Sequence, residues 1–113
     1  MDLSLERVIK GLIGLGLTRI DGEAYVYLAK VGPQRVIDLT KALNYDKQKI
    51  YTSLKNLQEK GIAKVTSQKD SIFSVLPFEE ALELLIKIEK DQVIKETKEE
   101  LLARWEIKDW PDS

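Results

Sequence analysis

The sequence predicts a mainly α-helical fold with one small β-hairpin and a long C-terminal helix. Apolar residues recur every three or four positions through residues 3–60, which is the spacing of helices with one buried face. In residues 62–76 the spacing changes to every second position, as in strands. From residue 78 a helical pattern returns and continues almost to the end. At 113 residues, the chain has the length of one domain with an appended helix.

Two helices are expected before residue 34. Apolar residues in the range 3–15 predict a first helix that ends at the glycines around residue 15. Thr18 and Asp21 have the spacing of a capping box, in which a side chain at each end caps the backbone of the other. A second helix is therefore expected from about Asp21 to Val31, and Gly32-Pro33 ends it.

The next two helices are separated by a tight turn. Residues 35–43 and residues 46–60 each carry apolar side chains at helical intervals, and Asn44-Tyr45-Asp46 lies between them. Asp46 is placed where a carboxylate suits the start of a helix, and Gly61 suits its end. Because about three residues join the two helices, no strand fits between them. This is the helix-turn-helix arrangement.

A hairpin follows the second of these helices. Residues 62–66 and 72–76 are expected to be strands rich in β-branched residues, and residues 67–71 form a polar tip. A hairpin at this position is a wing. The sequence therefore predicts a winged helix-turn-helix domain over residues 1–76, followed by a C-terminal helix and tail over residues 77–113.

The last helix has two expected parts. The part from Pro77 to about Ile88 should pack on the domain, whereas the remainder is too polar to be buried in one domain. That remainder still keeps an apolar stripe at near-heptad spacing, so we expect a homodimer held by a coiled coil. The alternative is a helix folded back on its own domain. The expected dimer contacts are Ile94, Leu101, Leu102, Trp105 and Trp110.

The composition disfavours several classes of function. The chain is 43% hydrophobic and 33% charged, which is typical of a globular domain. It contains no cysteine and no histidine, so it lacks thiolate chemistry, the commonest metal ligand and the commonest neutral-pH acid or base. We therefore expect that the protein is not an enzyme and that it binds no metal ion and no cofactor. Without a signal peptide or a run of about 20 apolar residues, we expect a cytoplasmic protein with no membrane contact.

The charges are segregated along the chain. The whole chain carries a net charge of −1, but residues 34–69 hold eight basic and three acidic residues, a net charge of +5. Residues 77–113 hold six basic and eleven acidic residues, a net charge of −5. Because a polyanion responds to the local field, double-stranded DNA is an expected partner of the helix-turn-helix and wing.

The helix over residues 46–60 has two different faces. Ile50, Leu54 and Leu57 form an apolar stripe, and the opposite face carries hydrogen-bonding groups. We interpret it as a recognition helix in a DNA groove; the alternative is an ordinary amphipathic surface helix. Gln pairs well with adenine, and lysines suit phosphates. The expected DNA-binding residues are Arg35, Lys47, Gln48, Lys49, Tyr51, Thr52, Lys55, Lys64, Gln68 and Lys69.

Several stretches also resemble the DNA-binding domain of TrmB-like archaeal and bacterial transcriptional regulators. The resemblance covers roughly residues 15–105. It rests on Leu15-Gly16-Leu17-Thr18, Glu23-Ala24-Tyr25-Val26-Tyr27-Leu28, Val31-Gly32, Lys49-Ile50-Tyr51-Thr52-Ser53-Leu54, Leu57, Lys60-Gly61-Ile62 and Pro77-Phe78-Glu79-Glu80-Ala81-Leu82. The resemblance implies a winged helix, DNA binding and dimerisation. A homodimer would place two recognition helices in successive major grooves, about 34 Å apart.

The chain departs from that family pattern at three points. The spacing from Thr18 to Glu23 is about two residues longer, and Asp46 stands where proline often opens the recognition helix. Many members carry a large C-terminal sugar-sensing domain, and this chain ends before one could begin, so sugar sensing is not implied. Two alternative functions are a winged-helix module that docks onto a protein of the transcription machinery, and a non-specific architectural DNA-binding protein.

Overall fold

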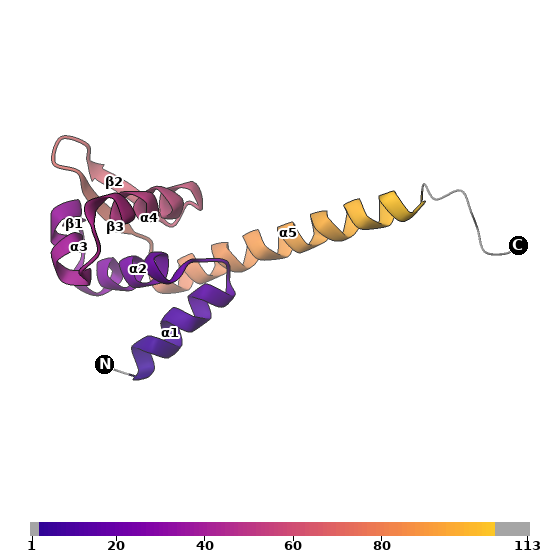
Figure 1. Cartoon of the computed structure of the whole chain (residues 1–113), viewed down its shortest axis with the longest axis horizontal. Helices are drawn as coiled ribbons and strands as arrows, with labels where there is room; N and C mark the ends of the chain where they lie inside the picture. Colours follow the sequence, from indigo (N-terminus) through magenta and orange to yellow (C-terminus); the bar gives the residue numbers. More distant parts are fainter. Residues whose placement is uncertain (1–2, 106–113) are drawn as a thin grey trace, which may run out of the picture.

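The computed structural model describes residues 3–105. Its elements are α1 (Leu3–Gly14), α2 (Arg19–Val31), β1 (Gln34–Arg35), α3 (Val36–Leu43), α4 (Lys47–Glu59), β2 (Ala63–Ser67), β3 (Ile72–Val75) and α5 (Phe78–Trp105). The expected fold class, mainly helical with a small sheet and a long last helix, is confirmed (Figure 1). All elements except the far part of α5 gather at one end of the molecule. We call residues 3–89 the head and residues 90–105 the distal segment.

The capping box at the start of α2 forms as expected. The Thr18 hydroxyl accepts a hydrogen bond from the backbone N–H of Asp21, and the Asp21 carboxylate accepts one from the backbone N–H of Thr18, both at 3.1 Å. The helix begins at Arg19, two residues before the expected start. Val31, in the last turn of this helix, is 52% exposed.

The sheet has three antiparallel strands in the order β1-β3-β2, one more than the expected hairpin. The additional strand pairs Gln34 with Phe73 and Arg35 with Ile72. Two residues are too few to show an alternating pattern, so β1 was not predicted. Arg35 was expected to begin α3 but instead ends β1 and caps α3, with φ −84° and ψ 159°. This third strand fixes the base of the wing to the start of α3.

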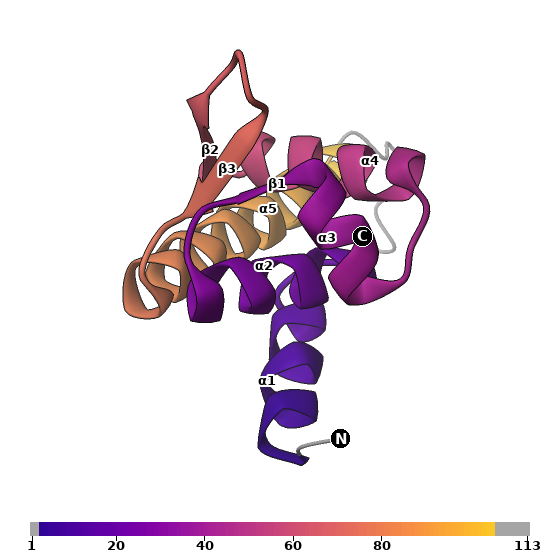
Figure 2. The ribbon, with the colours of Figure 1, turned by 90° about the vertical axis from the view of Figure 1, so that its left-hand side faces the viewer.

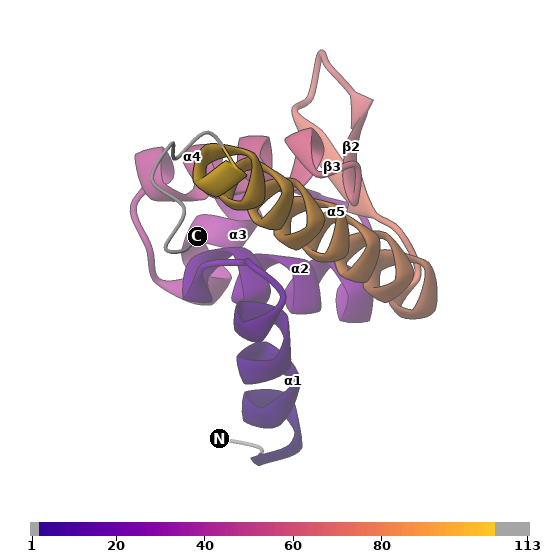
Figure 3. The ribbon, with the colours of Figure 1, turned by 90° about the vertical axis from the view of Figure 1, so that its right-hand side faces the viewer.

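The core confirms the apolar stripe of α4. Ile50, Leu54 and Leu57 are each 0% exposed. Ile50 and Leu54 join one buried cluster with residues of α2, α3 and β3, whereas Leu57 joins a second cluster with residues of α1, α2, β2 and α5. Because α4 contributes to both clusters, its inner face is anchored along its length. Figures 2 and 3 show α4 and the wing on one side of the head and α1 projecting on the other.

The first turns of α5 pack on the head, as expected. Ala81 and Leu85 are 0% exposed and complete the cluster that contains Leu57. After α4, Gly61 adopts φ +82°, the left-handed conformation expected for a glycine that ends a helix. A Cβ at this glycine would lie 3.2 Å from Leu84 Cδ2, so α5 passes close to the C-terminal end of α4. Every residue of the distal segment is exposed.

Candidate nucleic-acid interface

The outer face of α4 is polar and open to solvent. All six side chains selected on this helix from the sequence are exposed; they are Lys47, Gln48, Lys49, Tyr51, Thr52 and Lys55. At about 100° per residue, Gln48, Thr52 and Lys55 lie roughly opposite the buried Ile50. Glu59 continues the same row and is acidic, so it would repel phosphate. The first two and a half turns of α4 are therefore the part that suits a polyanion.

Tyr51 and Lys47 form one edge of this face. Tyr51 is 39% exposed, so its ring does not pack beneath the helix. The Lys47 ammonium lies 5.8 Å from the centre of that ring, within the range of a cation–π contact. This contact holds the Lys47 ammonium beside the Tyr51 ring, along the first turns of α4.

Asp46 fixes the first turn of α4. It is the N-cap residue, and its carboxylate accepts a hydrogen bond from the backbone N–H of Lys49 at 2.9 Å. The carboxylate also complements the positive end of the helix dipole. This cap defines the position from which Lys47, Gln48 and Lys49 project.

A buried carboxylate ties α4 to α2. Asp21 is 2% exposed, and its oxygens accept hydrogen bonds from the Ser53 hydroxyl at 2.6 Å and the Asn56 amide at 2.5 Å. With the backbone N–H of Thr18, this carboxylate has three donors. Burial of such a polar group is tolerated where hydrogen-bond donors surround it in this way. These hydrogen bonds fix the rotation of α4 about its own axis. They were not predicted from the sequence.

A second contact holds the turn before α4. The Tyr45 hydroxyl donates to the Glu23 carboxylate, with distances of 2.7 and 3.1 Å to its two oxygens. This hydrogen bond raises the pKa of Tyr45 above its ordinary value. Together, Asp21 and Glu23 of α2 hold α4 at its middle and at the turn that precedes it.

Between α2 and α4 there is a shallow depression of about 550 Å³ beside the outer face. Its walls include Thr18 and Ile20 on one side and Gln48, Thr52 and Lys55 on the other. The depression lets a ligand approach α4 from the α2 side as well as from above. Four of the expected DNA-binding residues, Gln48, Lys49, Thr52 and Lys55, thus line one depression.

Arg35 ends β1, which pairs with β3 at the base of the wing. The Arg35 guanidinium pairs with Asp38 at 3.3 Å, which raises the pKa of Arg35 and lowers the pKa of Asp38. Asp70 at the wing tip also raises the pKa of Arg35, so the tip and the start of α3 are close enough to interact. Lys64, Gln68 and Lys69 are exposed on the wing, whose tip turns at Ser71 with φ +52°.

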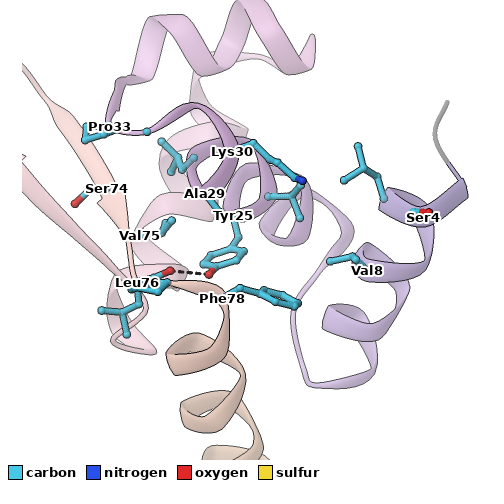
Figure 4. Close-up of a pocket in the computed structure, with 15 residues that line it drawn as sticks. Ser4, Val8, Tyr25, Ala29, Lys30, Pro33, Ser74, Val75, Leu76 and Phe78 are labelled. Carbon is cyan, nitrogen blue, oxygen red and sulfur yellow. Dashed lines mark hydrogen bonds between the residues drawn. The ribbon is translucent and has the colours of Figure 1, made fainter.

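A larger cavity, of about 610 Å³, lies away from α4, between α1, α2, β3 and the start of α5 (Figure 4). Its lining is mostly apolar. The buried Tyr25 hydroxyl beside it donates to the Leu76 carbonyl at 2.6 Å, and the Tyr25 ring lies 6.3 Å from that of Phe78, centre to centre. Burial raises the pKa of Tyr25 to about 12. Tyr25 therefore secures the junction between β3 and α5.

The expected dimer contacts are exposed wherever the structure describes them. The exposed fractions are 58% for Ile94, 62% for Leu101, 53% for Leu102 and 77% for Trp105. Trp110 lies outside the described residues. Val93, 57% exposed, is an additional apolar side chain on the same segment.

Within residues 3–105, no group of three or more acidic, histidine or cysteine side chains could hold a metal ion. Across the same residues, no helix combines the length and apolar character that crossing a membrane requires.

These elements define a winged-helix domain of the class found in transcriptional regulators. The family model described as the sugar-specific transcriptional regulator TrmB matches residues 12–79. The chain belongs to this family, and the resemblance seen in the sequence is confirmed.

Individual relatives agree with this assignment. The sugar-sensing transcriptional regulator TrmBL1 of Pyrococcus furiosus is 30% identical over 88 residues, which are 78% of this chain and 25% of that protein. This chain thus spans about a quarter of the length of that relative.

Solved structures share the fold. That of TrmBL2, an archaeal chromatin protein, has a TM-score of 0.78 at 23% identity and covers 91% of this chain and 40% of that chain. The transcriptional regulator Tm0710 of Thermotoga maritima has a TM-score of 0.60 at 20% identity, over 86% of this chain and 72% of that chain. The family and these neighbours are described as regulators or as a chromatin protein, not as enzymes.

Proposed function

We propose that this chain is a DNA-binding transcriptional regulator that binds duplex DNA as a homodimer through α4 and the wing. The observation that supports it is the outer face of α4, where exposed polar and cationic side chains stand on a helix anchored by buried Ile50, Leu54 and Leu57. A helix about 10–12 Å across fits the major groove, which is about 12 Å wide. We propose no catalytic role.

The side chains divide into two roles. Gln48 and Thr52 stand on the row opposite the core and read base edges: Gln48 pairs with adenine, and Thr52 contacts a thymine methyl or a base edge. Lys47, Lys49 and Lys55 neutralise phosphates and set the orientation of the helix. Tyr51 bonds a phosphate. Outside α4, the phosphate or minor-groove contacts are Arg35, Lys64, Gln68 and Lys69.

The distal segment is proposed as the dimerisation element. Its residues are all exposed, and an isolated helix of about 16 residues is only marginally stable in water. Ile94, Leu101 and Trp105 lie on one side of it and require an apolar partner. A second copy of the same helix supplies that partner in a two-fold symmetric dimer.

The two proposed roles fall on either side of the boundary between residues 76 and 77. Residues 1–76 bind DNA and residues 77–113 dimerise, while Ala81 and Leu85 in the first turns of α5 also complete the core of the head. The protein works in the cytoplasm and needs no cofactor or metal. The helix α5 thus connects the DNA-binding head directly to its partner.

A gel shift with random duplex DNA at several salt concentrations tests the proposal. If six to ten phosphates are neutralised per dimer, affinity falls by about 10³ to 10⁵ between 50 and 200 mM salt. The slope follows from counterion release, so it depends on the lysines and not on the sequence of the duplex. No binding at 50 mM salt, or an affinity that salt does not change, would contradict it.

A second candidate is a non-specific architectural DNA-binding protein. The solved structure of TrmBL2, described as an archaeal chromatin protein, shares the fold over 91% of this chain. The two candidates differ in whether any duplex is preferred. Selection of bound duplexes from fragmented genomic DNA decides: a regulator enriches a short shared site, whereas an architectural protein enriches none.

A further inference from the structure

We propose that the two α5 helices of the homodimer pair antiparallel, with the two-fold axis passing between Thr97 and Lys98. Ile94 of each subunit then lies against Leu101 of the partner subunit. This geometry rests on the proposed function, because it describes how the DNA-binding dimer is assembled.

The apolar residues of the distal segment are symmetric about that point. Val93 and Ile94 precede it by the same number of residues as Leu101 and Leu102 follow it, and all four are more than half exposed. Reversing the helix about the midpoint exchanges Ile94 with Leu101, so apolar side chains meet apolar side chains. The stripe thus complements its own reversed copy.

The apolar area is sufficient for a specific contact. Val93, Ile94, Leu101, Leu102 and Trp105 are 53–77% exposed. At on the order of 100 Å² each, mutual burial in the pair removes roughly 1,000 Å² from water, which is about the threshold for a specific interface.

The parallel and antiparallel pairs differ in where they place α4, because the apolar stripe and the end of α4 lie on different sides of α5. Leu84 lies on the side of α5 that faces Gly61 at the end of α4, since a Cβ on that glycine would be 3.2 Å from Leu84 Cδ2. Leu101 lies in the exposed apolar stripe. Seventeen residues separate these leucines, so at about 100° per residue they lie roughly a quarter turn apart around α5. The partner helix therefore packs beside α5, neither on the side towards the end of α4 nor directly away from it.

This direction has a consequence for DNA. In an antiparallel pair, the two-fold axis is perpendicular to both the helices and the line between them, so it runs from α5 towards α4. Both α4 helices then face the same side and can reach one duplex. In a parallel pair the axis runs along α5, and the two α4 helices would face opposite sides.

The spacing agrees with a single duplex. Leu85, which is buried in the head, is between twelve and thirteen residues from the proposed axis, or about 19 Å along the helix. The two heads are therefore anchored about 38 Å apart, close to the roughly 34 Å between successive major grooves on one face of DNA. The length of the distal segment thus sets the distance between the two DNA contacts.

Disulfide mapping in the full chain tests the pairing, since the chain has no native cysteine. Thr97→Cys cross-links to its own copy in either pairing and reports that α5 is the contact. Ile94→Cys and Leu101→Cys do not cross-link alone, because about 10 Å along the axis separates each from its copy. Co-expressed, these two variants give at least about tenfold more cross-linked dimer. Gln92→Cys, on the other side of the helix, is the matched control.

The outcomes separate this geometry from the proposed function. Equal cross-linking of Ile94→Cys and Leu101→Cys with their own copies shows a parallel pair and overturns the inference. Absence of cross-linking in Thr97→Cys, in a protein of dimer mass, also overturns it. If the antiparallel cross-links form but the protein gives no gel shift with DNA, the antiparallel pairing is supported and the proposed DNA binding is contradicted. Circular dichroism confirms that each variant remains helical.

Discussion

The outer face of α4 and the distal segment of α5 are both exposed helical surfaces, but they differ in what they expose and in how they are held. The α4 face is polar, and the opposite side of the helix is buried through Ile50, Leu54 and Leu57. The distal segment is exposed all round and carries apolar side chains such as Leu101, 62% exposed. A polar face on an anchored helix suits a hydrated polyanion, whereas an unanchored apolar stripe suits another helix. Exposure alone thus does not identify a partner; the chemistry and the anchoring do.

The largest effect is expected from breaking the apolar surface alone. Leu101→Glu places a charge in the proposed helix pair, so the dimer should separate and DNA affinity should fall by about 10² to 10⁴, because the second head no longer binds from a tethered position. Solution mass and a gel shift measure the two effects. Gln92→Glu adds the same charge on the other side of α5 and should leave both unchanged. A dimer that survives Leu101→Glu would show that the stripe is not the contact.

The next effect concerns the anchoring of α4. Asp21→Ala removes the acceptor of the Ser53 and Asn56 hydrogen bonds and leaves buried donors unpaired. We expect a loss of about 2–4 kcal/mol in the free energy of unfolding, measured by urea denaturation at fixed protein concentration. Asp70→Ala, at the exposed wing tip, should cost less than about 0.5 kcal/mol. Equal losses in both variants would mean that the buried tie does not stabilise the head.

Within the α4 face, two substitutions should separate reading from positioning. Gln48→Ala should relax the preference at one base pair by about 1–3 kcal/mol. Lys55→Ala should weaken binding to all duplexes alike and reduce the salt slope by about one. Binding measured against a set of single-base variants of a selected site, at two salt concentrations, distinguishes them. If neither variant changes binding, the outer face of α4 does not contact the DNA.

The smallest expected effect concerns Tyr25, at the junction between β3 and α5. Burial raises the pKa of Tyr25 to about 12, above its ordinary value near 10, so the folded state favours the neutral phenol. This contribution is complete below pH 10 and is lost as the pH rises from 10 to 12, by about 1–2 kcal/mol. Tyr25→Phe loses the hydrogen bond to Leu76, about 1 kcal/mol, but should lack that loss at high pH. If the free energy of unfolding depends on pH in the same way in both proteins between pH 10 and 12, Tyr25 is not the group responsible.

The features that the sequence predicted correctly are local ones. The apolar stripe of α4, the Thr18–Asp21 capping box and the left-handed Gly61 each depend on residues within one or two turns. The long helix α5 was also predicted, including the change from packed to exposed near Ile88. Periodicity and caps are sufficient for such elements because their geometry repeats along the chain.

The features that the sequence missed depend on distant contacts. Asp21 was recognised as part of a cap, but its carboxylate also reaches Ser53 and Asn56, 32 and 35 residues away. Strand β1 has two residues and exists only because β3 pairs with it. Arg35 was selected as a phosphate contact, and the structure adds its ion pair with Asp38. Ser53 lies beside the apolar stripe of α4 and is buried, which is the signal that could have indicated a buried polar contact.

The most direct test of the central claim is an NMR titration of the isotope-labelled chain with a short duplex at 50 mM salt. We expect the largest chemical-shift changes at Gln48, Thr52 and Lys55, smaller ones at Lys69, and none along α1 or around the Tyr25 cavity. Shift changes confined to α1 or α5, or no change at all at saturating duplex, would contradict the claim that the outer face of α4 binds DNA.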